Sequence, residues 1–322
     1  MANRRVTVFG GSGFIGRHLV RRLSAAGFLV RIAVRDTVAA EFLKPMGDIG
    51  QIVAQSATIT DDASVTRAVE GADWVVNLVG ILYERGANNF KAIHVDGAAR
   101  VARAAKAAGA RRLIHLSALG ADKGSASVYA RSKAQGEQEV LAAFPDATIL
   151  RPSVVFGPED DFFNRFAALT RISPVLPVFS DSLVRITGPS FQPVYVGDVA
   201  QAILTALTEP GHTGKIYELG GPRPYTMREI MELVSATIER PRRIVPIPFW
   251  LGKLEAAVLQ FLPKPPLTPD QVVLLMSDNV LNGRFPGLAE MGITPEPVEA
   301  HLSSYLRRYR ALFSHTILRP RQ

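Results

Sequence analysis

A glycine-rich turn near the start of the chain constrains the fold more than any other feature. Residues 5–9 (RVTVF) have the β-branched composition of a buried strand, and glycines follow at positions 10, 13 and 16. Apolar residues then recur at helical spacing over residues 14–23. This order of strand, glycine turn and helix is typical of a dinucleotide site. There Gly10 permits the turn, Gly13 the approach of a pyrophosphate, and Gly16 the packing of helix on strand.

The helix after the turn predicts how a phosphate is held. Its N-terminus, near Gly13, offers backbone N–H groups without helical partners and the positive end of the helix dipole. The expected cofactor contacts of this turn are Gly10, Ser12, Gly13, Phe14, Ile15 and Gly16. A glycine-rich turn without a ligand is the alternative interpretation.

Strand and helix patterns alternate through the first half of the chain. Further strands are expected at residues 30–34, 52–54, 74–79, 112–117 and 147–150. The clearest helical patterns between them cover residues 91–108 and 129–143. Apolar strands separated by helices predict an α/β fold, a Rossmann-type doubly wound parallel sheet with both faces covered.

The pattern loosens after about residue 152, where prolines recur. Helices are expected at residues 199–207, after a capping box at Thr226–Glu229, and in an amphipathic stretch at residues 249–262. We therefore expect an NADP(H)-binding Rossmann domain over residues 1–155, to which segments at 194–196 and 217–219 return. Residues 156–322 are expected to form a smaller irregular α/β lobe with a basic tail. Apolar pocket walls are expected from Phe162, Phe163, Phe191 and Trp250.

Composition narrows the chemistry. The 322 residues are 47% hydrophobic, and no apolar run approaches the length of a membrane span. No signal or transit peptide is expected before the first strand. The chain has no cysteine, which excludes disulfides and thiolate chemistry, and its six histidines lack metal-ligand spacing.

Positive charge gathers at the end of the chain, and the net charge is +8. Residues 301–322 contain five arginines and no acid: Arg307, Arg308, Arg310, Arg319 and Arg321. Such a tail suits an anionic partner such as acidic lipid, and no nucleic-acid motif accompanies it. A solvated basic end without a partner is the alternative.

The end of the second strand indicates which nucleotide is bound. Arg35 follows Val34 at the place where an acid reads the ribose hydroxyl in NAD sites, and an arginine there suits the 2′-phosphate of NADP. Asp36 is expected to turn away, and Arg31 and Arg17 to assist. The preference is for NADPH over NADH, with a surface arginine as the alternative.

A tyrosine and a lysine predict the chemistry. Tyr129 and Lys133 are one helical turn apart, and the ammonium favours ionisation of the phenol. Ser117 ends the preceding strand, where its hydroxyl can hold a substrate carbonyl. These three are the candidate catalytic residues.

Together these residues resemble the short-chain dehydrogenase/reductase superfamily. The resemblance rests on Gly10-x-x-Gly13-x-x-Gly16, the strand end Val75–Gly80, Ser117 and Tyr129-x-x-x-Lys133, and covers roughly residues 5–240. Arg151–Pro158 and Pro193–Val199 resemble its extended branch. Within that branch the chain is most similar to the atypical subgroup that includes the NADPH-binding accessory subunit of respiratory complex I, the alpha-subcomplex subunit nine family. The pointers are Arg35, Ser117–Asp122 and the segment Asp270–Val280.

The resemblance implies tightly bound NADPH, with cofactor contacts also from Val79, Tyr129, Lys133, Pro152 and Val154. It implies a structural or assembly role among complex I subunits, without independent turnover, and a possible vestigial role for Ser117, Tyr129 and Lys133. The implied location is peripheral, at the cytoplasmic face of a bacterial inner membrane or on the matrix side of a mitochondrial one. The basic tail and residues 249–262 would then touch lipid headgroups or a partner subunit, although residues 249–262 also suit an ordinary packed helix.

Two departures and two alternatives stand beside this interpretation. His94 occupies the place of an asparagine that supports a proton relay in extended members, and Thr58 that of an acid that commonly contacts adenine. Because Tyr129 and Lys133 are intact, a free-standing NADP-dependent reductase or epimerase of a small carbonyl substrate is the second hypothesis. A cofactor-sensing regulator of nitrogen metabolism, which usually lacks the tyrosine–lysine pair, is the third.

Overall fold

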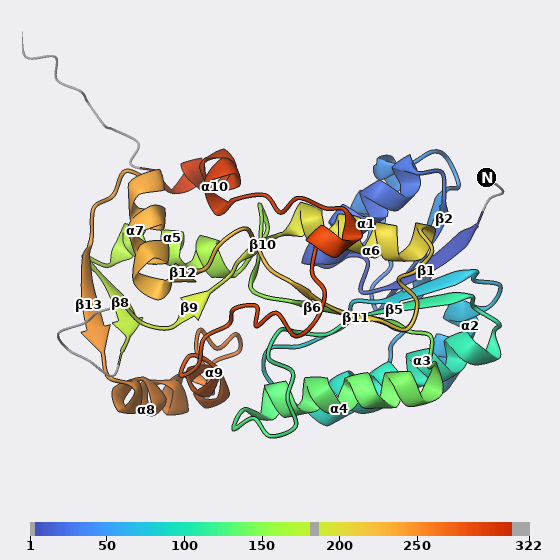
Figure 1. Ribbon diagram of the computed structural model, residues 1–322, viewed down its shortest axis with the longest axis horizontal. Helices are drawn as coiled ribbons and strands as arrows, with labels where there is room; N and C mark the ends of the chain where they lie inside the picture. The colour runs from blue at the N-terminus through green and yellow to red at the C-terminus, as the bar shows by residue number, and fades with distance from the viewer. Residues whose placement is uncertain (1–3, 181–186, 311–322) are drawn as a thin grey trace, which may run out of the picture.

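The computed structural model describes residues 4–180 and 187–310, and a parallel sheet forms its centre (Figure 1). The strands lie in the order β11-β6-β5-β4-β1-β2-β3, and every neighbouring pair is parallel. Their bounds are β1 Arg5–Phe9, β2 Leu29–Val34, β3 Ile52–Ser56, β4 Trp74–Asn77, β5 Arg112–Leu116, β6 Thr148–Pro152 and β11 Ile216–Leu219. The order reverses direction between β1 and β4, which is where ligands of doubly wound sheets bind. The predicted fold class is confirmed.

Helices cover both faces of this sheet (Figure 1). On one face lie α1 (Phe14–Ala25) and α6 (Val196–Thr208), whose apolar residues share a core with β1, β2 and β11. On the other lie α2 (Asp62–Val69), α3 (Ala98–Ala107) and α4 (Val128–Ala143). The 3-10 helix η1 (Glu41–Met46) joins β2 to β3. Both cores are rich in Val, Ile, Leu and Ala, as a sheet buried on both faces requires.

A smaller lobe extends from one end of the sheet and has its own apolar core (Figure 1). Its helices are α5 Phe162–Ile172, α7 Met227–Thr237, α8 Phe249–Leu259, α9 Pro269–Leu274, α10 Val298–Leu306 and the 3-10 helix η4 Arg307–Tyr309. The 3-10 helix η3 (Ala289–Met291) packs instead on the core of the central sheet. The strands of the smaller lobe pair two by two: β7 (Val155–Phe156) with β10 (Val194–Tyr195), β9 (Ser190–Phe191) with β12 (Tyr225–Thr226), and β8 (Val175–Phe179) with β13 (Arg243–Ile247). The predicted capping box at Thr226 is present and begins α7.

Three sequence expectations meet different outcomes. Residues 217–219 return to the sheet as part of β11, as predicted. Residues 194–196 do not: Val194 and Tyr195 pair with β7, and Val196 already begins α6. The helix expected over 91–108 begins as a π-helix, η2 (Lys91–Gly97), before α3. The helix α4 lies so close that a side chain at Gly136 would collide with the carbonyl oxygen of His94.

A buried ion cluster connects α4, β6 and β11. The guanidinium of Arg151 donates to Glu137 through Nε at 2.9 Å and Nη2 at 2.6 Å, and its Nη1 lies 3.7 Å from Oε1 of Glu218. Both carboxylate side chains are only 5% exposed. Burial raises the pKa of Glu218. The arginine therefore neutralises two carboxylates that water does not reach.

Replacing Arg151 with alanine is expected to lower the free energy of unfolding by about 3–5 kcal/mol, because Glu137 and Glu218 would remain buried without a cation. Denaturant unfolding followed by circular dichroism measures the change. Arg228→Ala is the matched control: its partner Glu232 is exposed, so the loss should stay below about 0.5 kcal/mol. Similar losses in the two variants would contradict the assignment.

Candidate functional site

The glycine turn has the geometry that the sequence predicts. Gly10 follows β1 with φ +79°, a conformation that favours glycine. A Cβ atom at Gly16 would lie 2.6 Å from Cα of Gly11 and closer still to the carbonyl oxygen of Gly10, so only glycine lets α1 approach the turn. Beside the turn, Cγ2 of Val79 lies 3.4 Å from the position of a Cβ atom on Gly10. The first and fourth strands thus contribute neighbouring backbone at the carboxyl edge of the sheet.

The N-terminus of α1 is open at this edge. Its N-cap residue is Gly13, no side chain caps the helix, and its first turn contains no acid. Gly13 is exposed, while Ser12, Phe14 and Ile15 are partly exposed. The free N–H groups and the positive dipole end are therefore available to an anion, and the residues fit a dinucleotide pyrophosphate.

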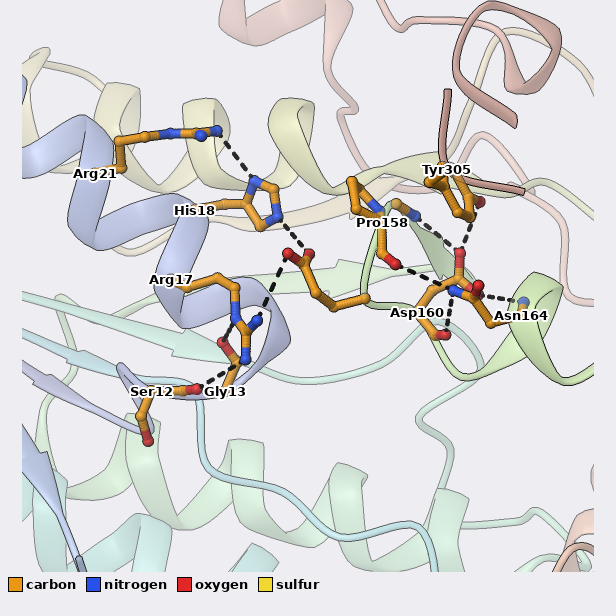
Figure 2. Close-up of polar contacts among 11 residues, drawn as sticks. Ser12, Gly13, Arg17, His18, Arg21, Pro158, Asp160, Asn164 and Tyr305 are labelled. Atoms are coloured by element: carbon orange, nitrogen blue, oxygen red, sulfur yellow. Dashed lines mark hydrogen bonds and ion pairs between the residues drawn. The ribbon is translucent and has the colours of Figure 1, made fainter. Parts of the chain in front are cut away.

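A charged cluster lies beside this helix end (Figure 2). Arg17 donates to the carbonyl oxygens of Ser12 and Gly13 at 3.5 and 3.4 Å. Its Nη1 is 3.6 Å from Glu159, whose other carboxylate oxygen is 3.0 Å from Nε2 of His18. Arg17 thus lies beside the predicted phosphate site. The sequence did not reveal the contact with Glu159, because Glu159 comes from the loop before α5, far along the chain.

Three residues in and after β2 were expected to bear on which nucleotide binds, and the structure corrects the expectation for Arg31. Arg35 is exposed and has no hydrogen bond or ion pair to another described residue. Asp36 accepts hydrogen bonds from the backbone N–H groups of Val38 and Ala39, both at 3.0 Å, so its carboxylate is committed to its own turn. Arg31 does not assist: it donates to the carbonyl oxygens of residues 68 and 70 at the far side of the strand.

The predicted pair on α4 lies against the fifth strand. Lys133 is buried, and its Nζ donates to the carbonyl oxygen of Leu116 at 3.3 Å and lies 6.0 Å from the centre of the Tyr129 ring. Burial lowers the pKa of Lys133 to about 8 and raises the pKa of Tyr129 to about 12. The pair is therefore close in space, but burial opposes ionisation of the phenol.

Ser117 follows Leu116 and is 4% exposed. Its backbone N–H donates to Leu150 across the sheet, whereas its buried hydroxyl has no hydrogen-bond partner within the described parts of the chain. Buried hydroxyls are normally paired, so an unpaired one at a strand end fits a ligand oxygen. Pro152 ends β6, and Val154 follows two residues later, so the predicted contacts from this strand lie at the same sheet edge.

His94 joins the same cluster from η2. Its Nε2 accepts a hydrogen bond from the backbone N–H of Ile81 at 3.0 Å, which places the proton on Nδ1, 2.9 Å from the hydroxyl of Ser132. Burial, with the positive charge of Lys133 next in importance, lowers the pKa of His94 to about 2. A neutral histidine therefore replaces the relay asparagine, and its ring lies edge-on to Tyr129.

Several predicted residues lie elsewhere or were overlooked. Phe163 and Phe191 are core residues of the second lobe, and Trp250 is exposed on α8, so these three do not line a shared pocket. Phe162 packs against the same core. Asp270 and Asn279 belong to a segment that carries the family resemblance. Asp270 accepts a hydrogen bond from the backbone N–H of Tyr129, and Asn279 donates one to the carbonyl oxygen of Leu119, two residues after Ser117. The sequence Thr268–Gln271 is a capping box that would have located α9.

Comparison with known proteins places the chain among nucleotide-dependent enzymes and their relatives. Residues 6–220 match the model of the NAD dependent epimerase/dehydratase family. NADH dehydrogenase [ubiquinone] 1 alpha subcomplex subunit 9, mitochondrial, of Mus musculus is 36% identical over 94% of this chain and 80% of its own length. Ceramide reductase of Caulobacter vibrioides is 31% identical over 76% of this chain and 73% of its own length. The solved dTDP-glucose 4,6-dehydratase DesIV of Streptomyces venezuelae has the same fold, with a TM-score of 0.73, 22% identity, and coverage of 95% and 96%.

The buried histidines predict how stability depends on pH. The pKa values of His94 and His115 are lowered to about 2 and about 3, so the unfolded chain binds protons that the folded chain excludes. The free energy of unfolding should therefore fall as the pH drops below about 6.5. His94→Gln, whose amide oxygen reaches about as far as Nε2 and so keeps an acceptor for Ile81, should reduce this slope in urea unfolding at several pH values. An unchanged slope would show that His94 does not carry the effect.

Proposed function

The chain belongs to the NAD dependent epimerase/dehydratase family and, within it, to the family of the alpha subcomplex subunit 9 proteins, and from this premise we propose that it is an accessory subunit of respiratory complex I, NADH:ubiquinone oxidoreductase. The observation that carries the proposal is the 36% identity to the mouse subunit over 94% of this chain. In this role the protein holds a nicotinamide nucleotide tightly and contributes to structure or assembly without turnover of its own.

Nicotinamide-nucleotide binding follows from the family, and the glycine turn, the open end of α1 and the unpaired hydroxyl of Ser117 fit such a ligand. We assign the pyrophosphate to residues 10–16 and the nicotinamide side to Val79, Ser117, Tyr129 and Lys133, with Pro152 and Val154 nearby. NADPH is the proposed form. The support for it is the uncommitted guanidinium of Arg35 beside an Asp36 carboxylate that is already used.

The exposed face of α8 supports assembly with other subunits. Trp250, Leu254 and Val258 expose 60–70% of their surface, and an apolar patch of this kind marks an interaction site. None of the described helices is both long and apolar enough to cross a membrane. We propose a peripheral position, at the cytoplasmic face of a bacterial inner membrane or on the matrix side of a mitochondrial one.

Contact of the basic tail with anionic lipid is a further part of the proposal, and the fold limits which arginines serve it. Arg308 donates to Asn164, and Arg310 pairs with Glu239 and donates to a carbonyl oxygen of α7. Arg307 is exposed and makes no ion pair to another residue that the structure describes, so it is the arginine of this part of the tail that we propose for such contact. Arg319 and Arg321 lie outside the described residues.

A free-standing reductase is the second candidate, and one observation favours it. The hydroxyl of Ser117 has no hydrogen-bond partner among the described residues, and Ser117 follows Leu116, whose carbonyl oxygen accepts from Lys133. Such a free hydroxyl suits a substrate carbonyl. The similarity to a ceramide reductase points in the same direction.

Native electrophoresis after mild-detergent extraction separates the two candidates. An accessory subunit should migrate with NADH:ubiquinone oxidoreductase activity, because its apolar α8 face is covered in the assembly. The purified protein should not oxidise NADPH with a panel of carbonyl compounds. Migration as a free monomer or dimer, together with a carbonyl reductase rate that is lost in Tyr129→Phe, would favour the reductase.

Arg35→Asp tests the nucleotide preference. Loss of a charge-assisted contact worth about 1.5–3 kcal/mol should reduce the ratio of NADPH to NADH affinity by about 10- to 100-fold in isothermal titration calorimetry. Arg103→Asp, an exposed site on α3, makes the same change in net charge and should leave the ratio unchanged. Equal ratios in the two variants would show that another residue reads the 2′-phosphate.

A further inference from the structure

The segment from Asp270 to Asn279, the strap, connects the second lobe to the strand ends of the site. It begins in α9, whose Val272 packs with Phe249 and Ala256 of α8. It ends where Asn279 forms a bridge to Phe191. This segment is one of those on which the family resemblance rests, and its contacts give a physical reason for its sequence.

Asp270 caps the helix that carries Tyr129 and Lys133, although it lies more than 140 positions away in sequence. Its Oδ1 accepts from the backbone N–H of Val128 at 2.7 Å. Its Oδ2 accepts from the backbone N–H of Tyr129 at 3.1 Å and from the hydroxyl of Ser127 at 2.8 Å. The same carboxylate lies in the first turn of α9. One negative charge is thus placed between the positive ends of two helices, where it is favourable for both.

Asn279 holds the other end of the strap against the loops after β5 and β6. Its Oδ1 accepts from the hydroxyl of Ser153 at 2.6 Å, and its Nδ2 donates to the carbonyl oxygen of Leu119 at 3.3 Å. Leu119 is two residues after Ser117, and Ser153 lies between Pro152 and Val154. The strap therefore contacts Tyr129 itself and residues next to Ser117, Pro152 and Val154, which are among those proposed for the nicotinamide half of the cofactor.

Folding of α4 alone does not account for this arrangement. The helix already has a local N-cap, because the hydroxyl of Ser127 accepts from the N–H of Ala130. Asp270 adds the two N–H groups that precede it, including that of Tyr129 itself. The additional contacts fix where the first turn of α4 lies relative to the second lobe.

We propose that Asp270 and Asn279 are positioning residues, through which the strap sets the place of Tyr129, Lys133 and Ser117 for the nicotinamide half of the nucleotide. The inference rests on the proposed nucleotide binding. Because coupling between two sites is reciprocal, a nucleotide that binds better when the strap is seated must also stabilise the seated strap.

Two ligands distinguish positioning from general stability. NADPH reaches the nicotinamide side, whereas adenosine 2′,5′-bisphosphate contains only the adenine half, which the glycine turn and Arg35 would hold. Asp270→Ala should weaken NADPH binding by up to about fivefold, the change expected if the whole stabilising contribution of a helix cap is coupled to binding, and leave adenosine 2′,5′-bisphosphate affinity unchanged. Asp270→Asn, which keeps one acceptor oxygen, should fall between the wild type and Asp270→Ala. Calorimetry measures all of these affinities.

Asp122→Ala is the matched control. Asp122 is an exposed aspartate in the loop before α4, where its carboxylate accepts from the N–H of Gly124 within the same loop. Its loss should change neither affinity. In the wild type, NADPH should also slow hydrogen exchange in the strap, whereas adenosine 2′,5′-bisphosphate should not.

Each contrary result overturns a different statement. If the wild type binds both ligands and Asp270→Ala binds NADPH as tightly as Asp122→Ala does, the positioning role is wrong while nucleotide binding stands. If Asp270→Ala weakens both ligands equally, the residue has a structural role only. If the wild type binds neither ligand, the proposed function fails and this inference fails with it.

Discussion

The packing of α1 onto the turn after β1 is the constraint on which the rest of the structure depends. A methyl group at Gly16 would collide with the backbone of Gly10 and Gly11, so the helix can lie this close only with glycine. That approach places the free N–H groups of α1 at the edge of the sheet where β1 and β4 end, the point at which the strand order reverses. Arg35, Val79, Ser117, Pro152 and Val154 follow or end neighbouring strands of the same parallel sheet, whereas α4 carries Tyr129 and Lys133 against the fifth strand.

Close backbone approach recurs on the opposite face and explains the unusual geometry there. A side chain at Gly136 of α4 would meet the carbonyl oxygen of His94, so the two helical segments touch through their backbones. The π-helical turn of η2 and the buried neutral ring of His94 belong to this contact. Burial in such a tight interface excludes water, which is why Lys133 and His94 both have lowered pKa values.

Local sequence patterns were sufficient to predict the sheet, the glycine turn and the Tyr129–Lys133 pair, because each is encoded within a few neighbouring residues. The patterns failed where the structure depends on partners distant in sequence. Val194 has the same β-branched character as a sheet strand, yet it pairs with β7. Glu159 and Asp270 are ordinary loop and helix acids in sequence, and only the fold brings them to Arg17 and to α4. The sequence placed Arg31 near the nucleotide, but its guanidinium donates to carbonyl oxygens of α2 and of the residue after α2.

The electrostatics of the tyrosine–lysine pair bear on whether the site turns over. A phenol that delivers and recovers protons near neutral pH needs a lowered pKa, but burial raises that of Tyr129 to about 12. The positive charge of Lys133 would lower the pKa of the phenol, but burial also lowers the pKa of Lys133 itself, to about 8. The negative charge of Glu137 raises the pKa of Lys133, but the Glu137 carboxylate is already bonded to Arg151. A protonated phenol and an ammonium are both hydrogen-bond donors, and donors suit the hydroxyl oxygens of a nucleotide ribose. In this protonation state the two side chains can donate to the ribose of the nucleotide that we propose, which is the role that the accessory-subunit proposal gives them.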